Sequence, residues 1–260
     1  MNVNLNKDVL YPFLIYSDAF QYNNSITLYP VKMKNVLEFQ LFSQAITVRK
    51  NSRFPDKKII KMSYLDFIVY AAKNPEFGEI YVMPDLVHYF GYILHLLMLV
   101  CVGQKVSYTD NGKIFINGFE ITPEIFDDLR RIIIVQNDID FDIDEFLNYD
   151  TERRLLKAQN DISKIKDKAT LEDYIDSLMV ALHLTEDEVK NMSIRKFWRF
   201  IKRFNLHENY TICKTGEAGG MVTYKDPIKH WMVSIDEDDK YSNLKTNEKN
   251  LKDKIAGANS

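Results

Sequence analysis

Carboxylates at alternating positions form the densest group of potential metal ligands in this sequence. The acidic side chains of this run are Asp138, Asp140, Asp142, Asp144 and Glu145. A calcium-binding EF-hand loop also alternates its oxygen ligands, but it requires a glycine at its sixth position and a glutamate at its twelfth. Counted from Asp138, those positions hold Ile143 and Tyr149. We therefore expect a solvated acidic linker here rather than a metal site.

Histidine and cysteine, which also bind metals or act as nucleophiles, are scattered along the chain. They are His88, His95, Cys101, His183, His207, Cys213 and His230. His88 and His95 lie seven positions apart, whereas two ligands on one metal-binding helix prefer a spacing of four. Neither cysteine lies in a known nucleophile context, and the chain has no GxSxG motif. We expect both cysteines to be small buried side chains in a reducing compartment.

The glycines between Gly216 and Gly220 are the remaining feature that could bind a ligand. The stretch Gly-Glu-Ala-Gly-Gly has the glycine content of a phosphate-binding loop, but no Gly-Lys-Ser/Thr follows it and no helix pattern begins there. We interpret these glycines as a turn. Together with the acidic run and the scattered histidines, this predicts a protein that is not an enzyme and that has no catalytic, cofactor-binding or metal-binding residues.

A basic amphipathic helix that begins after Ser193 is the strongest candidate for a binding surface. Apolar residues recur at three- and four-residue spacing along it: Ile194, Phe197, Trp198, Ile201 and Phe204. The candidate partner-binding residues lie off this stripe and are Arg195, Lys196, Arg199, Phe200, Lys202 and Arg203. They could contact a partner protein, a nucleic acid or an anionic membrane. Alternatively, the stripe packs on neighbouring helices and the basic face is solvated or pairs with acidic neighbours.

The overall charge is close to neutral, with 34 basic and 37 acidic residues and a net charge of −3. Proteins whose main partner is a nucleic acid usually carry a clear positive excess, so this balance argues against that class. The opening residues, MNVNLNKDVL, lack the basic and apolar regions of a signal peptide. Leu86–Val102 has no formal charge, but it is short for a membrane span and contains two histidines. We expect it to be a helix buried on most sides.

The first part of the chain alternates strand-like and helical patterns. Tyr11–Tyr16 and Ser25–Tyr29 are rich in aromatic and β-branched residues and predict strands. Apolar residues at helical spacing predict a helix over Met33–Val48, and a second helix over Tyr64–Lys73 with Ser63 as its N-cap.

A β-hairpin is predicted in the middle of the chain, where two short β-prone runs flank Asn111-Gly112. Asn-Gly favours a type I′ turn, in which both residues have positive φ. Thr122-Pro123 then supplies an N-cap and a first-turn proline for a helix that extends to about Gln136.

Mostly helical patterns fill the rest of the chain. Thr170, Thr185 and Ser193 are predicted N-caps, and the last of them begins a helix over Ile194–Leu206. Glycines and β-prone residues over Tyr210–Ile235 predict a loop-and-strand segment.

The expected fold class is α+β. Residues 1–137 are the predicted N-terminal domain, with mixed strands and helices and the β-hairpin, and 138–150 are the acidic linker. Residues 151–235 are the predicted mainly helical C-terminal domain, and 236–260 are a predicted disordered tail, because they are polar and poor in apolar residues.

Two parts of the sequence resemble proteins of bacteriophage tail and baseplate gene clusters. SITLYPVKMKNVLEFQLFSQA, at Ser25–Ala45, is similar to a motif in which a short strand leads through a Pro-Val-Lys-Met-Lys segment into a helix. Within Leu171–Met232, LEDYIDSLMVALHLTEDEVKNMSIRKFWRFIKRF and the closing GEAGGMVTYKDPIKHWM resemble helical domains of phage tail assembly proteins. The resemblance covers less than half of the chain, and its motifs are structural rather than catalytic.

The resemblance implies a non-enzymatic tail or baseplate assembly chaperone. Such a protein holds an aggregation-prone partner, for example the tape measure or a hub subunit, until that partner polymerises. It would act in the cytoplasm of the infected bacterial host. The alternatives are a structural subunit retained in the baseplate or connector of the virion, and a nucleic-acid-binding protein that acts through residues 194–206. An enzyme is the last alternative.

Overall fold

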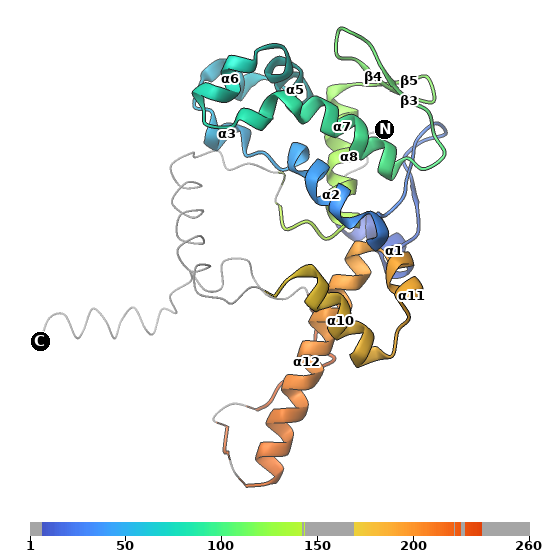
Figure 1. Cartoon of the computed structure of the whole chain (residues 1–260), viewed down its shortest axis with the longest axis vertical. Helices are drawn as coiled ribbons and strands as arrows, with labels where there is room; N and C mark the ends of the chain where they lie inside the picture. The colour runs from blue at the N-terminus through green and yellow to red at the C-terminus, as the bar shows by residue number, and fades with distance from the viewer. Residues whose placement is uncertain (1–6, 142, 144–168, 221, 225–226, 236–260) are drawn as a thin grey trace, which may run out of the picture. The chain divides into compact units, whose positions relative to one another are not determined.

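The computed structural model describes residues 7–141, 143, 169–220, 222–224 and 227–235. Helices and two small antiparallel sheets make up these residues, so the predicted α+β class is confirmed (Figure 1). Most of the predicted acidic linker and the whole predicted tail lie outside the described residues.

The chain divides into two compact units. Unit 1 contains Met1–Arg153 and Ala169–Trp198, and unit 2 contains Arg154–Lys168 and Arg199–Ser260. The domain limits inferred from the sequence concern parts that fold independently. They stay predictions, and cleavage of the chain between the two predicted domains would test them.

Unit 1 begins with helix α1, Lys7–Tyr16, so the prediction of a strand at Tyr11–Tyr16 is wrong. The run from Val9 to Tyr16 has no charged side chain, and without polar positions a strand and a helix give the same short apolar pattern. A helix places Leu10 and Leu14, four residues apart, on one side, and both are buried.

The strand predicted over Ser25–Tyr29 is present as the shorter strand β2, Thr27–Leu28. It pairs antiparallel with β1, Phe20–Gln21.

The helix predicted over Met33–Val48 is divided into three short pieces. They are the 3₁₀ helix η1, Met33–Asn35, the α-helix α2, Val36–Phe42, and the 3₁₀ helix η2, Ser43–Ile46. The Ser43 hydroxyl donates to the Gln40 carbonyl at 3.4 Å, and the Thr47 hydroxyl donates to the Ser43 carbonyl at 3.2 Å. Such side-chain bonds compete with the main-chain pattern of an α-helix, and they fall where α2 ends.

Four helices then enclose an aromatic core. They are α3, Lys50–Arg53, α4, Lys57–Lys61, α5, Tyr64–Lys73, and α6, Pro75–Ile80. Helix α5 has the predicted bounds, and its cap is confirmed because the Ser63 hydroxyl accepts from the Asp66 amide at 3.1 Å. The Phe54 ring centroid lies 5.1 Å from that of Phe67 and 5.2 Å from that of Phe77. All three rings are buried, so they anchor these helices to one another.

The long apolar segment forms the 3₁₀ helix η3, Pro84–His88, followed by α7, Tyr89–Val100. The expectation of a helix buried on most sides is confirmed for α7, whose buried residues are Tyr89, Ile93, Leu94, Leu96, Leu97 and Val100. Among the described helices, none combines the length and the apolar content that crossing a membrane requires.

A three-stranded sheet follows α7, and its two turns both contain Asn-Gly. The strands are β3, Val106–Tyr108, β4, Ile114–Ile116, and β5, Phe119–Ile121, all labelled in Figure 1. They pair antiparallel in the order β3-β4-β5. The hairpin around Asn111-Gly112 is confirmed, but its predicted type I′ turn is wrong, because only Gly112 has positive φ, at 88°. The Gly112 amide donates to the Thr109 carbonyl, as in a three-residue loop whose last residue is left-handed.

The type I′ turn belongs instead to the next pair of strands. Ile116 pairs with Phe119, which leaves Asn117 and Gly118 as a two-residue turn. Their φ values are 50° and 80°, so both have the positive φ that this turn requires.

Helix α8, Pro123–Gln136, completes the N-terminal part of unit 1 with the predicted bounds and cap. Its buried residues include Phe126, Leu129, Ile132, Ile133 and Ile134.

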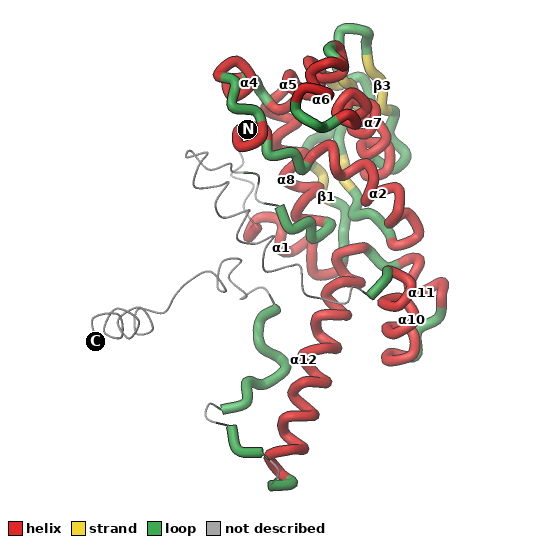
Figure 2. The backbone as a smooth tube through the Cα atoms, turned by 60° about the vertical axis from the view of Figure 1, so that its left-hand side comes forward, coloured by secondary structure: helices red, strands yellow, loops and turns green. Residues whose placement is uncertain are grey.

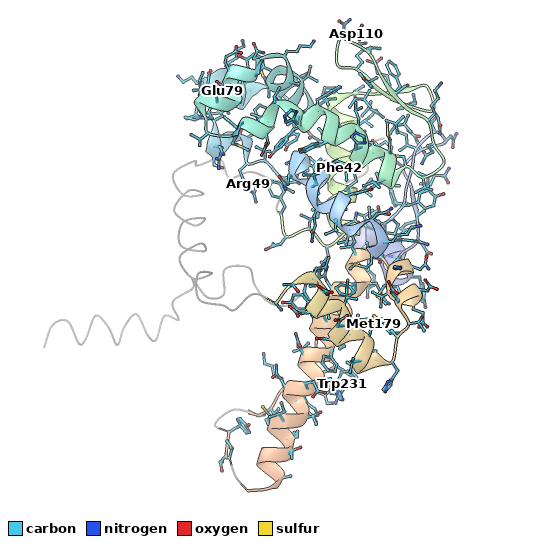
Figure 3. All side chains as sticks on the ribbon, viewed as in Figure 1. Phe42, Arg49, Glu79, Asp110, Met179 and Trp231 are labelled. Atoms are coloured by element: carbon cyan, nitrogen blue, oxygen red, sulfur yellow. The ribbon has the colours of Figure 1, made fainter. Side chains whose placement is uncertain are left out.

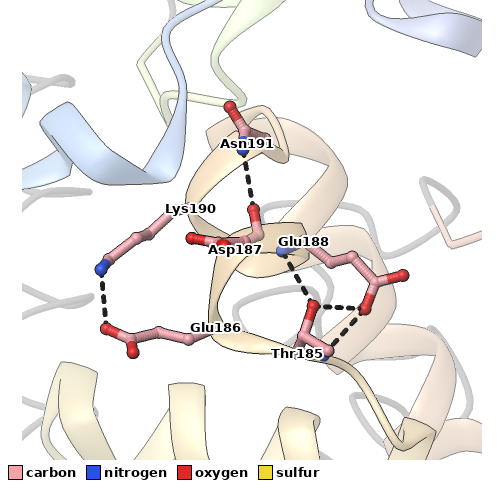
Figure 4. Close-up of polar contacts among 6 residues, drawn as sticks. All are labelled: Thr185, Glu186, Asp187, Glu188, Lys190 and Asn191. Carbon is pink, nitrogen blue, oxygen red and sulfur yellow. Dashed lines mark hydrogen bonds and ion pairs between the residues drawn. The ribbon is translucent and has the colours of Figure 1, made fainter.

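Three further helices come from the C-terminal part of the sequence. They are α10, Leu171–Leu182, α11, Glu186–Asn191, and α12, Ile194–Ala218. The predicted caps at Thr170 and Thr185 are confirmed, and both form complete capping boxes. Figure 4 shows the second box, in which Thr185 and Glu188 each bond the other residue's main-chain amide.

Main-chain hydrogen bonds join the two ends of unit 1. The Met33 amide donates to the Met192 carbonyl at 2.8 Å, and the Ile194 amide donates to the Val31 carbonyl at 2.9 Å. Segments more than 150 residues apart in sequence are therefore parts of one packed structure.

Candidate partner-binding surface

Helix α12 carries the six residues that the sequence indicated as partner-binding. The Ser193 hydroxyl accepts from the Lys196 amide at 3.2 Å, so the predicted cap at Ser193 is confirmed. The helix continues to Ala218, well past the predicted end at Leu206. The expectation of a loop and strand from Tyr210 is therefore wrong for residues 210–218, and Gly216 is helical rather than part of a turn.

The first two basic residues of α12 hold α1 in place. Arg195 is only 7% exposed, so the expectation that it lies on a solvated face is wrong. Its Nη1 donates to the Leu14 carbonyl at 3.2 Å, and Lys196 Nζ lies 3.5 Å from the Ile15 carbonyl. These carbonyls belong to the last turn of α1, where main-chain oxygens lack helical partners and attract positive charge.

Arg203 has a similar structural role within unit 2. Its Nη1 donates to the main-chain carbonyls of Trp231 and Val233, the second at 3.0 Å. Lys202 is exposed, whereas Arg199 and Phe200 are partly exposed. Of the six residues, Lys202 is thus the one with an exposed side chain.

The described part of unit 2 has a thin apolar core. Over residues 199–220, 222–224 and 227–235, Ile201 is the one buried hydrophobic residue. By contrast, Ile212 is 65% exposed and Met232 is 66% exposed. Val222 and Tyr224 are also exposed. Unit 2 thus leaves several apolar side chains in water.

A second exposed apolar surface lies on α1, where sequence reasoning found no site. Tyr16 is 81% exposed and Tyr11 is 58% exposed, and Val9 and Ile15 are exposed beside them. A helix that is apolar on all sides is normally buried, so the outer side of α1 is an unusual surface. The uncharged run from Val9 to Tyr16 was a signal that could have revealed it.

A small pocket in unit 1 does not have the size of a ligand site. It is lined by Phe13, Leu14, Ser17, Asp18, Pro30, Gln136 and Arg195. Its empty volume is about 160 Å³, including open solvent, whereas small-molecule pockets usually have ~300–1,000 Å³. The buried Gln136 Oε1 has no hydrogen-bond partner within the described structure, and its amide nitrogen donates to the Leu28 carbonyl at 3.3 Å.

The titratable side chains with shifted pKa values are accounted for by burial and local bonds. Burial raises the pKa of the Cys101 thiol to about 12. It also raises the pKa of Asp127, even though Arg130 and Arg131 act in the opposite direction. No three His, Cys, Asp or Glu side chains gather as a metal site within the described residues.

Comparison with protein-family models gives a match in the C-terminal part of the chain. Residues 163–236 match the family model described as YomV second domain. This is a Bacillus phage-type protein family. The matched region includes α10, α11 and α12, and it associates this part of the chain with a phage protein family. Comparison with curated proteins and with solved structures gives no match.

Proposed function

We propose that this chain is a non-enzymatic phage assembly protein that binds a tail or baseplate protein during morphogenesis. The proposal rests on the apolar surface exposed on the outer side of α1, which includes the rings of Tyr11 and Tyr16. Exposed apolar surface of this kind marks interaction sites. The match to a phage protein family supplies the biological context for the partner.

The C-terminal unit offers a second contact region for the same partner. Lys202, Arg199 and Phe200 lie on α12 beside the thin core of unit 2. Basic groups around an apolar surface speed the encounter with an acidic partner and make binding weaken as salt concentration rises.

The test is co-purification of phage proteins from infected-cell lysate with the wild-type chain and two folded variants. Tyr11→Ser/Tyr16→Ser removes aromatic rings from the exposed side of α1, and Arg199→Glu/Lys202→Glu reverses charge on α12. We expect the α1 variant to lose the partner and the α12 variant to recover less of it at low salt concentration. Retention of every wild-type partner by the α1 variant would overturn the proposal.

A separate measurement distinguishes an assembly chaperone from a virion subunit. A chaperone leaves once its partner polymerises, so we expect purified particles to contain none of this chain by mass spectrometry. Its presence in stoichiometric amount would instead support a structural subunit of the baseplate or connector.

A further inference from the structure

A segment that follows α12 runs back along the helix. We call its described residues, 222–224 and 227–235, the return segment (Figure 2). Val222 lies next to Gly216, with its Cγ2 4.0 Å from the position a Cβ would take there. Farther along, the His230 ring lies 5.0 Å from that of Tyr210, and the Trp231 ring lies 5.1 Å from that of His207. The segment is thus antiparallel to the helix.

Side chains of α12 contact both the main chain and the aromatic rings of the return segment. The Arg203 guanidinium donates to the carbonyls of Trp231 and Val233. Trp231, labelled in Figure 3, lies edge-on to His207 and stacks with His230 at 5.8 Å. The Tyr224 hydroxyl is hydrogen-bonded to the Cys213 thiol, which raises the pKa of Tyr224. The bonded residues form a turn, in which the Val233 amide donates to the His230 carbonyl at 3.2 Å. The bonds from Arg203 therefore select a main-chain turn, and the rings select an aromatic side chain.

The return segment is only lightly held. None of its described residues is buried, and none belongs to a helix or strand. Segments with few buried contacts and few main-chain hydrogen bonds open at low free-energy cost. The hydrogen bonds of α12 are internal to the helix, so the surface beneath the segment persists when the segment leaves.

We propose that this surface, formed by Arg203, His207, Tyr210 and Cys213, binds an aromatic, turn-forming segment of a partner protein in place of the return segment. The inference rests on the proposed function, because it supposes that the chain has a protein partner. It adds where that partner binds and which chemistry it brings. The occupant is inferred from the segment that the surface already holds.

In this arrangement the return segment is an internal competitor. A segment joined by a short link acts at an effective concentration on the order of mM, so a separate peptide binds poorly while the internal one is intact. A change that weakens the internal segment should therefore increase the affinity for a separate peptide, and a change in the helix surface should decrease it.

The experiment uses a fluorescent synthetic peptide with the sequence of residues 222–235 and measures its binding to the full chain by anisotropy. Trp231→Ala in the chain removes the central ring of the internal segment, and we expect the peptide to bind at least ~10-fold more tightly than to wild type. Adding Arg203→Gln should abolish this gain. Asn205→Ala is the matched control, since Asn205 is exposed and lies two helical positions from Arg203, on the far side of the helix.

Two outcomes would overturn the proposal. One is that the peptide does not bind the Trp231→Ala chain more tightly than wild type, although circular dichroism shows that chain to be folded. The other is that light scattering shows the Trp231→Ala chain to dimerise without taking the peptide, which would make a second copy the occupant. No phage protein enters this measurement, so its failure is separate from failure of the co-purification test.

Discussion

At the scale of single residues, the two Asn-Gly turns show how backbone conformation and packing add. Gly112 and Gly118 have similar φ values, 88° and 80°. A Cβ on Gly112 would lie 2.7 Å from Val69 Cγ1, whereas a Cβ on Gly118 would meet no atom within 4 Å. A substitution at Gly118 therefore tests backbone strain alone, whereas one at Gly112 tests strain together with a collision with Val69.

We predict that Gly118→Ala lowers the free energy of unfolding by ~1 kcal/mol, because it strains a left-handed position only. Gly112→Ala should cost more, ~2–4 kcal/mol, since strain and overpacking combine. Urea unfolding measures both. Val69→Ala removes the colliding side chain, so the double variant Gly112→Ala/Val69→Ala should lose less unfolding free energy, relative to Val69→Ala alone, than Gly112→Ala loses relative to wild type. Equal losses for Gly112→Ala and Gly118→Ala would contradict the structure.

Asp127 gives a prediction about pH. Burial raises its pKa in the folded chain, so the folded state binds the proton more tightly than the unfolded state. Stability therefore falls as pH rises from the ordinary aspartate pKa through the raised one. Asp127→Asn has no charge to bury, so we expect its melting temperature to exceed that of wild type at pH 7. The difference should shrink toward pH 4, and a difference that grows on acidification would refute this reading.

At the scale of elements, the basic start of α12 is a support for α1. We predict that Arg195→Gln lowers the free energy of unfolding by ~1.5–3 kcal/mol, because a charged donor to the Leu14 carbonyl is lost from a buried position. Lys202→Gln, on the same helix but exposed, should change stability by less than ~0.5 kcal/mol. Chemical denaturation of the two variants provides the comparison, and similar losses would mean that Arg195 does not support α1.

Helices with strong caps could be predicted from the sequence. Ser63, Thr122, Thr170 and Thr185 each mark the start of a helix, because a hydroxyl that accepts from a first-turn amide is a local signal. Tyr11–Tyr16, part of helix α1, was wrongly predicted as a strand because its uncharged run gives no periodicity that separates a strand from a helix. The longer extent of α12 was missed because glycine and threonine lower helix propensity locally.

The candidate surface could be predicted only in part. The sequence locates the basic helix, but it does not reveal that Arg195 is buried or that Arg203 bonds the return segment. Those roles depend on contacts with Leu14 and Val233, which lie far from the helix start in sequence. Local patterns identify amphipathic faces, whereas tertiary contacts decide which charges remain available to a partner.

At the scale of the whole chain, unit 1 combines two separate stretches of the sequence, Met1–Arg153 and Ala169–Trp198. We predict that a protease site inserted between Arg153 and Ala169 can be cut without separating the two fragments. Main-chain bonds such as Met33 to Met192 join them, and so does Arg195. Size-exclusion chromatography after cleavage should show one peak with both fragments. Separate peaks under native conditions would favour residues 151–235 as an independent domain.

The bond between Arg195 and Leu14 spans 181 positions. Ribosomes add roughly 5–20 residues per second, so the last turn of α1 waits on the order of 10–40 s during synthesis before its support has been made. Through that interval the nascent chain presents Leu10, Leu14 and their apolar neighbours without the residue that fixes them. We therefore expect the last turn of α1 to reach its final structure late in synthesis, and the newly made chain to be a client for ribosome-associated chaperones.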